Sequence, residues 1–71
     1  MAEAWSLDVY SSNIKSVGYD AEAKEMIVTF QKGGRYAYPG VTEEKALQLA
    51  NAPSAGSLFH AEFKQLPFRK L

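Results

Sequence analysis

The feature that most constrains the fold is a pair of strand-like segments joined by two glycines. Residues 25–31 place an apolar side chain at every second position, which is the period of a strand with one buried face. Gly33 and Gly34 follow, and we expect both to supply the positive φ angles of a tight reverse turn. Residues 35–38 then form the returning strand, so the sequence predicts an antiparallel hairpin.

The returning strand carries two tyrosines on one face. Because side chains alternate along a strand, Tyr36 and Tyr38 point one way, and Arg35 and Ala37 point the other. One interpretation is that the tyrosines form a platform on which nucleic-acid bases stack. The other is that both rings pack beneath helices, with their hydroxyls at the rim. The sequence leaves both interpretations open.

The rest of the chain predicts two more strands and two short helices. Trp5, Leu7 and Val9 alternate like a half-buried strand, and residues 14–19 are rich in strand formers. Thr42 is a good N-cap for a helix that runs to about Asn51. The expected buried stripe of this helix is Ala46, Leu47, Leu49 and Ala50. In the second helix, Phe59, Phe63 and Leu66 share one face. The predicted fold is therefore α+β: a three- or four-stranded antiparallel β-meander followed by two short α-helices packed on one face.

Length and composition place these elements in one small domain. A chain of 71 residues without cysteine has neither a disulfide framework nor a thiolate zinc site, so its stability must come from its apolar core. The first ten residues lack the basic start and apolar run of a signal peptide, and we therefore expect a cytoplasmic protein. The formal net charge is zero, but residues 26–71 carry three acidic and six basic side chains. A local basic surface in this part is compatible with the neutral total.

The chain resembles the KTSC domain, a short module found at the C-terminus of some lysyl-tRNA synthetases and also as a separate protein in bacteria and phages. The resemblance covers Ser11 to about Lys70. It rests on Ser11-Ser12-Asn13-Ile14, Val17-Gly18-Tyr19-Asp20, Phe30 with Gly34, Tyr36-Ala37-Tyr38, Val41, and Ser54-Ala55-Gly56 with Phe59.

The resemblance divides the chain into an N-terminal extension, residues 1–10, with an expected edge strand, and a KTSC-like domain, residues 11–71. It also implies RNA binding. The chain departs from the family pattern at His60, where asparagine is common, and at residues 66–68, which replace a more tyrosine-rich tail.

Several side chains are candidates for holding an anionic, aromatic ligand. Arginine engages two phosphate oxygens at once, and lysine supplies a point charge. Residues 54–57 precede a helix, where serine and glycine either contact an anion or serve only for capping and close packing. The predicted ligand-binding residues are Lys15, Lys32, Arg35, Tyr36, Tyr38, Ser54, Gly56, Phe59 and His60. Lys64, Arg69 and Lys70 form a second basic group, which we expect on a mobile tail.

The sequence offers no reaction chemistry. His60 is the sole histidine, and no spacing pairs it with a nucleophile, so we expect no enzyme activity, no metal and no cofactor. The leading hypothesis is a small non-catalytic module that binds RNA or a nucleotide. The alternative is a protein-interaction module, for example a phage-encoded modulator of a host machine such as RNA polymerase or a defence system, which would use an open sheet edge or the surface around Trp5 and Tyr10. Self-association into a homo-oligomer is a third hypothesis.

Overall fold

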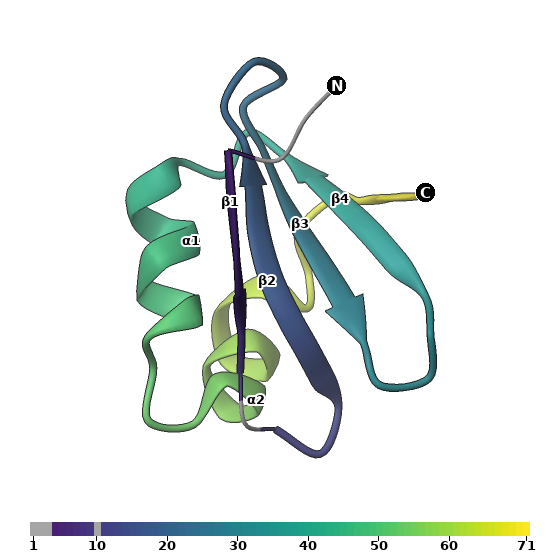
Figure 1. Cartoon of the computed structure of the whole chain (residues 1–71), viewed down its shortest axis with the longest axis vertical. Helices are drawn as coiled ribbons and strands as arrows, with labels where there is room; N and C mark the ends of the chain where they lie inside the picture. Colours follow the sequence, from purple (N-terminus) through teal and green to yellow (C-terminus); the bar gives the residue numbers. More distant parts are fainter. Residues whose placement is uncertain (1–3, 10) are drawn as a thin grey trace.

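The computed structural model describes residues 4–9 and 11–71 and contains one antiparallel sheet with helices on one face (Figure 1). The strand order follows the sequence, β1-β2-β3-β4-β5. The strands are β1 (Trp5–Asp8), β2 (Ile14–Asp20), β3 (Glu25–Phe30), β4 (Arg35–Pro39) and β5 (Arg69–Lys70). The helical segments are α1 (Glu43–Ala50), α2 (Ala55–Leu58) and a π-helical turn, η1 (Phe59–Phe63). The predicted α+β meander followed by short helices is confirmed.

The sheet has five strands rather than three or four, because the C-terminal segment returns to it. Arg69 lies opposite Ala37 in the β4–β5 ladder, and its guanidinium forms a two-point ion pair with the buried carboxylate of Glu25, with contacts of 2.6 and 3.2 Å. The expectation that Arg69 and Lys70 belong to a mobile tail is therefore wrong. A strand of two residues is too short to show an alternating pattern of apolar and polar side chains. The sequence therefore does not reveal that this segment pairs with β4.

The turns depend on particular backbone conformations. Gly33 has a φ of +100° and closes the β3–β4 turn, as predicted, whereas Gly34 does not have a positive φ. Gly34 instead gives room to a ring, because a Cβ there would lie 3.0 Å from Cε1 of Tyr36. In the β2–β3 turn, the Asp20 carboxylate accepts hydrogen bonds from the backbone amides of Glu22 and Ala23, at 3.0 and 3.1 Å. That turn ends at Lys24, whose φ is +57°.

The core lies between the sheet and the helices. Its largest fully buried side chains are those of Phe63, Ile14, Met26, Leu49, Val17 and Val28. Helix α1 begins as predicted, with Thr42 Oγ1 accepting a hydrogen bond from the Lys45 amide at 3.3 Å. Ala46 and Leu49 are buried, but Leu47 is 39% exposed and does not belong to the buried stripe. Among the described residues, no helix is long and apolar enough to cross a bilayer.

Strand β1 is an outer strand of the sheet, and Trp5 connects it to α1. The indole stacks on the Tyr19 ring, with centroids 6.3 Å apart, and its Nε1 donates a hydrogen bond of 2.8 Å to Glu43 Oε2. Trp5, assigned from sequence to a protein-binding surface, therefore has intramolecular partners. Tyr10, assigned to the same surface, lies outside the described residues.

We expect Trp5→Phe to lower the free energy of unfolding by about 0.5–1.5 kcal/mol, because the ring packing is kept while one hydrogen bond is lost. The measurement is urea denaturation followed by circular dichroism. Glu43→Gln is the matched control, since its amide oxygen still accepts from the indole. A Trp5→Phe variant as stable as the parent would show that this contact contributes nothing.

Candidate ligand-binding pocket

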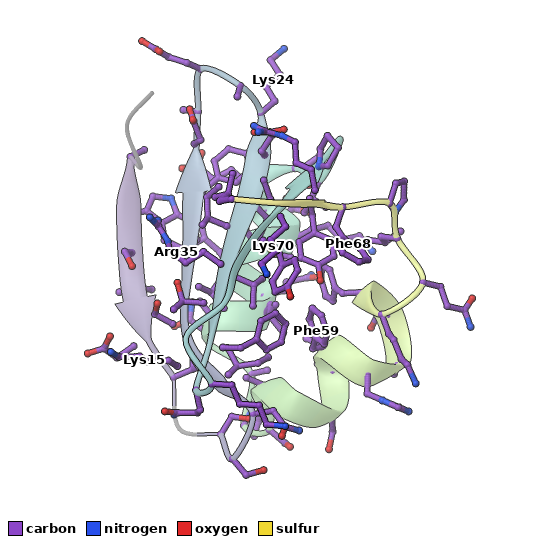
Figure 2. All side chains as sticks on the ribbon, turned by 90° about the vertical axis from the view of Figure 1, so that its right-hand side faces the viewer. Lys15, Lys24, Arg35, Phe59, Phe68 and Lys70 are labelled. Atoms are coloured by element: carbon purple, nitrogen blue, oxygen red, sulfur yellow. The ribbon has the colours of Figure 1, made fainter. Side chains whose placement is uncertain are left out.

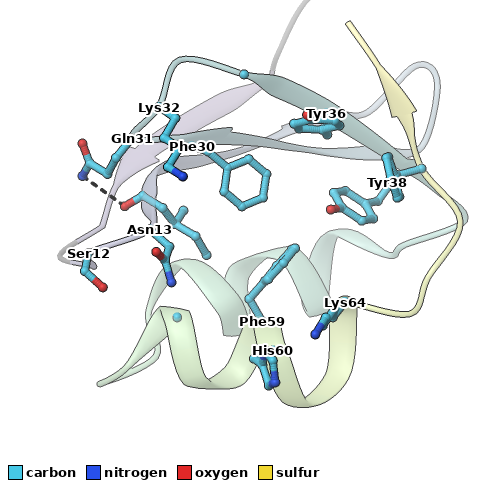
Figure 3. A pocket seen from close by; sticks show the side chains of 14 residues that line it. Ser12, Asn13, Phe30, Gln31, Lys32, Tyr36, Tyr38, Phe59, His60 and Lys64 are labelled. Carbon is cyan, nitrogen blue, oxygen red and sulfur yellow. Dashed lines mark hydrogen bonds between the residues drawn. The ribbon is translucent and has the colours of Figure 1, made fainter.

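A cavity of about 570 Å³ opens between the sheet and the α2–η1 segment (Figure 3). The sheet side supplies residues from β3, β4 and the turn between them, and the helical side supplies Gly56, Phe59, His60 and Lys64. Its lining residues are Ser12, Asn13, Ile14, Phe30, Gln31, Lys32, Gly34, Tyr36, Tyr38, Gly56, Phe59, His60, Lys64 and Phe68. The volume is in the range of pockets that hold small molecules.

Aromatic rings form the apolar part of the lining. Phe59 packs edge-to-face on Phe30 and on Tyr38, with centroids 5.5 and 5.8 Å apart. Tyr36 packs edge-to-face on both Phe30 and Phe68, each at 5.4 Å. Edge-to-face pairs are the favourable geometry for such rings, so they hold one another in fixed orientations.

The rings differ in how much of them is open to a ligand. Tyr38 is only 4% exposed and belongs to the core. This is the environment that the packing interpretation predicted for both tyrosines. Tyr36 and Phe59 are partly buried. Phe68 is 55% exposed and packs against both Tyr36 and Tyr38. Phe68 is therefore the ring with most surface available for stacking.

The basic residues of the lining are Lys32, His60 and Lys64. Among the residues that the structure describes, no carboxylate belongs to the lining. Glu62, the one acidic residue of η1, forms an ion pair with Lys45 of α1 at 3.6 Å, outside the pocket. In a chain with equal numbers of acidic and basic residues, this distribution gives the pocket a local preference for anions.

Gln31 fixes the polar end of the pocket. Its Nε2 donates to the carbonyl oxygens of Ser11 and Ile14, at 3.3 and 3.4 Å, and its backbone amide donates to the Asn13 carbonyl at 2.8 Å. These contacts tie the segment before β2 to the end of β3. Figure 3 shows the Asn13 side chain directed toward the helical wall. Its amide group is placed to exchange hydrogen bonds with a ligand.

The structure brings together most of the residues predicted from the sequence. Lys32, Tyr36, Tyr38, Gly56, Phe59 and His60 line the pocket. Lys15, Arg35 and Ser54 do not belong to the lining. Lys15 lies at a register shift in β2, and Arg35 projects from the face of β4 opposite Tyr36 (Figure 2). The Ser54 hydroxyl donates to the Ser57 hydroxyl at 3.0 Å and makes no capping bond to the backbone of α2.

Sequence reasoning did not assign several lining residues to the site, notably Asn13, Gln31, Lys64 and Phe68. Gln31 and Asn13 had a usable signal, because they flank the paired ends of β2 and β3 that lie away from the β2–β3 turn. Lys64 follows His60 by four positions, the spacing that places two residues on one helical face. Phe68 gave no signal, since its position depends on the return of the chain to β5.

Close packing between the segment before β2 and helix α2 supports the helical wall. Ser11 Oγ accepts from the amides of Asn13 and Ile14, at 3.2 and 3.3 Å, and so shapes the start of β2. A Cβ added to Gly56 would lie 2.9 Å from this same oxygen. Glycine at this position is therefore explained by close approach to the Ser11 hydroxyl.

This contact predicts a non-additive pair of substitutions. Gly56→Ala is expected to cost about 1–3 kcal/mol, as overpacking does, and Ser11→Ala about 1 kcal/mol for its lost hydrogen bonds. Because Ser11→Ala removes the clashing oxygen, the double variant should be clearly more stable than the sum of the two losses implies. Urea denaturation of the four proteins measures the coupling. Strictly additive losses would contradict the assigned clash.

The Tyr38 hydroxyl links stability to pH. Burial, and secondarily the neighbouring Tyr36, raises the pKa of Tyr38 above its ordinary value of 10.0. The folded state therefore keeps this proton to higher pH than the unfolded state does. Its stabilising effect is complete below the ordinary value and is lost as pH rises through the folded-state pKa.

We expect the free energy of unfolding to fall as the pH passes 10.0, and to fall less steeply in Tyr38→Phe. Thermal unfolding of both proteins across this pH range measures the difference. Identical pH profiles would show that Tyr38 titrates as it does in the unfolded chain.

The structure defines the chain as a small α+β domain with an open pocket between one face of its sheet and its helices. It belongs to the KTSC domain family, which it matches over residues 10–67. An uncharacterized protein of Stutzerimonas stutzeri (strain A1501) is 37% identical over 59 residues, covering 83% of each chain. The crystal structure of a KTSC domain protein from Yersinia pestis is similar with a TM-score of 0.83 and 32% identity, covering 94% of this chain and 96% of that one.

Proposed function

We propose that this domain is a non-catalytic binding module that holds RNA or a nucleotide in the pocket between the sheet and η1. One observation carries the proposal. The same cavity combines a wall of aromatic rings with Lys32, His60 and Lys64, and none of the described residues contributes a carboxylate to its lining. A nucleotide is the common biological ligand that presents a flat ring and an anionic group together, so both parts of the lining have a function in this interpretation.

Each part of the ligand has a matching surface. A base stacks on the exposed face of Phe68, a contact that tolerates any base because every base has a π face. The Tyr36 ring is 78° away from the plane of Phe68, so it meets that base edge-on. The side-chain amide of Asn13 offers hydrogen bonds to the base edge or the ribose. Gln31 offers only its amide oxygen, because its Nε2 already donates to the Ser11 and Ile14 carbonyls. The lysines take the phosphate oxygens.

The proposal includes no chemical step. His60 lines the pocket, but a histidine acts as a base only when a nucleophile lies within hydrogen-bond reach. Across residues 4–9 and 11–71, no hydrogen bond joins His60 to a hydroxyl or a carboxylate, and no group of three metal-ligating side chains forms. Ligand binding accounts for the residues that line the pocket without a catalytic base or a metal ion.

The test is titration with labelled, mixed-sequence single-stranded RNA and with the four nucleoside monophosphates at low salt. We expect saturable binding whose affinity falls steeply between about 50 and 200 mM salt, because phosphate contacts release counterions. Absence of any heat or anisotropy change at low salt, for every ligand of the panel, would contradict the proposed function.

One observation favours protein binding as a second candidate function. Among the described strands, β1 pairs with β2 alone, and Leu7 on this strand is 40% exposed. Outer strands accept strands from partner proteins. Such binding would resist salt and would weaken when Leu7 is replaced by lysine, whereas binding in the pocket would not respond to that substitution.

A further inference from the structure

The basic residues of the pocket lie on two opposite walls. Lys32 belongs to the β3–β4 turn, on the sheet side, whereas His60 and Lys64 belong to η1 and its C-terminal cap. Figure 3 shows Lys32 beside Gln31 and Asn13 at one end of the pocket. Lys64 lies at the other end, below Tyr38, and the Phe30 and Phe59 rings lie between the two lysines.

Both lysines are available to a ligand. Lys45 pairs with Glu62 and Arg69 pairs with Glu25. Within the described ranges, neither Lys32 nor Lys64 takes part in an ion pair. The nearest acidic residue in sequence to Lys64 is Glu62, and Lys45 already holds it. The positive charges at the two ends of the pocket are therefore not neutralised by carboxylates.

This separation distinguishes between two sizes of ligand. A nucleoside monophosphate carries its phosphate on one side of the ribose, so it engages the cationic group at only one end. A nucleoside within a chain has a phosphate on each side. Its base rests on the rings while the two phosphates meet Lys32 and Lys64.

We infer that the preferred ligand is a single-stranded oligonucleotide segment with at least two phosphates, whose backbone crosses the mouth of the pocket from Lys32 to Lys64. This inference rests on the proposed function and narrows it from nucleotides in general to chains. It follows from the placement of two lysines without carboxylate partners on opposite walls, with the Phe30 and Phe59 rings between them.

A length series tests the inference. Binding of a nucleoside monophosphate, a 5′-phosphorylated dinucleotide and a tetranucleotide is measured by calorimetry at several salt concentrations, in RNA and DNA form. We expect the dinucleotide to bind about tenfold more tightly than the monophosphate, because it adds one charge-assisted contact. The tetranucleotide should add little beyond that, since the pocket holds one base.

Charge variants assign the contacts. Lys32→Gln and Lys64→Gln should each reduce the salt slope for the dinucleotide by about 0.7, the single-strand value for one phosphate. For the monophosphate, only one of the two variants should have an effect. Lys24→Gln is the matched control, because Lys24 lies in the β2–β3 turn, remote from Phe59 in Figure 2. Circular dichroism confirms that each variant folds.

The outcomes separate this inference from the function on which it rests. Equal affinity and equal salt slope for the monophosphate and the dinucleotide would overturn the inference and leave nucleotide binding intact. A Lys24→Gln effect as large as that of Lys32→Gln would also overturn it, since the attraction would then be non-specific. If no ligand of the series binds at low salt, the proposed function itself fails.

Discussion

Replacing Phe63 by alanine is expected to lower the free energy of unfolding by about 3–5 kcal/mol, the usual loss for a large aromatic side chain removed from a core. Phe63 is 2% exposed and stacks on Phe59, with ring centroids 6.2 Å apart. It is the largest of the fully buried side chains on the helical layer. A domain of this size rarely has more stability than such a loss removes, so most of the variant should be unfolded at 25 °C.

The measurement is urea denaturation followed by the fluorescence of Trp5, the sole tryptophan. Phe63→Leu provides a variant that still folds, with an expected loss of about 1.5 kcal/mol. Phe68→Ala is the control, because Phe68 is 55% exposed and its removal leaves no cavity. A Phe63→Ala variant no less stable than Phe68→Ala would show that η1 does not anchor the helical layer as described.

Phe68→Ala is expected to weaken single-stranded RNA binding by about 5- to 150-fold, which corresponds to the loss of about 1–3 kcal/mol of stacking on one base. The reason is geometric. Phe68 is the most exposed ring of the pocket and packs on Tyr36 and Tyr38, so it presents a face that the other rings cannot. Fluorescence anisotropy at constant salt measures the change.

Leu71→Ala provides the matched control for that experiment. Leu71 is an exposed apolar residue of the same segment, at 45% exposure, but it does not line the pocket. Its backbone amide, which donates to the Arg35 carbonyl, is kept in the variant. If Leu71→Ala weakens RNA binding as much as Phe68→Ala does, the effect arises from the C-terminal segment as a whole and not from stacking.

The elements that sequence could predict are those governed by local rules. Alternation identified β3 and β4, and the Thr42 cap and its first-turn glutamates located the start of α1. These features depend on neighbours within a few residues, so a single sequence contains them. The face of β4 that carries Tyr36 and Tyr38 followed from the same alternation, and with it the central wall of the pocket.

Features set by distant contacts could not be predicted in this way. The pairing of β5 with β4 depends on Glu25 meeting Arg69, which are 44 positions apart. Leu47 was placed in the buried stripe because its residue type is apolar, but α1 buries a narrower face. The role of Gly34 could not be predicted without knowing where the Tyr36 ring lies. The pocket itself joins Asn13, Gln31 and Phe68 only after the sheet and helices have packed.

Backbone amide NMR during titration with a 5′-phosphorylated dinucleotide tests the central claim most directly. The account predicts saturable shifts that cluster at Asn13, Gln31, Lys32, Gly34, His60 and Lys64, with little change at Ser6, Thr29 and Arg35 on the opposite side of the sheet. Shifts concentrated on that opposite side, or along β1, would place the ligand elsewhere and contradict the claim that this pocket is the nucleotide site.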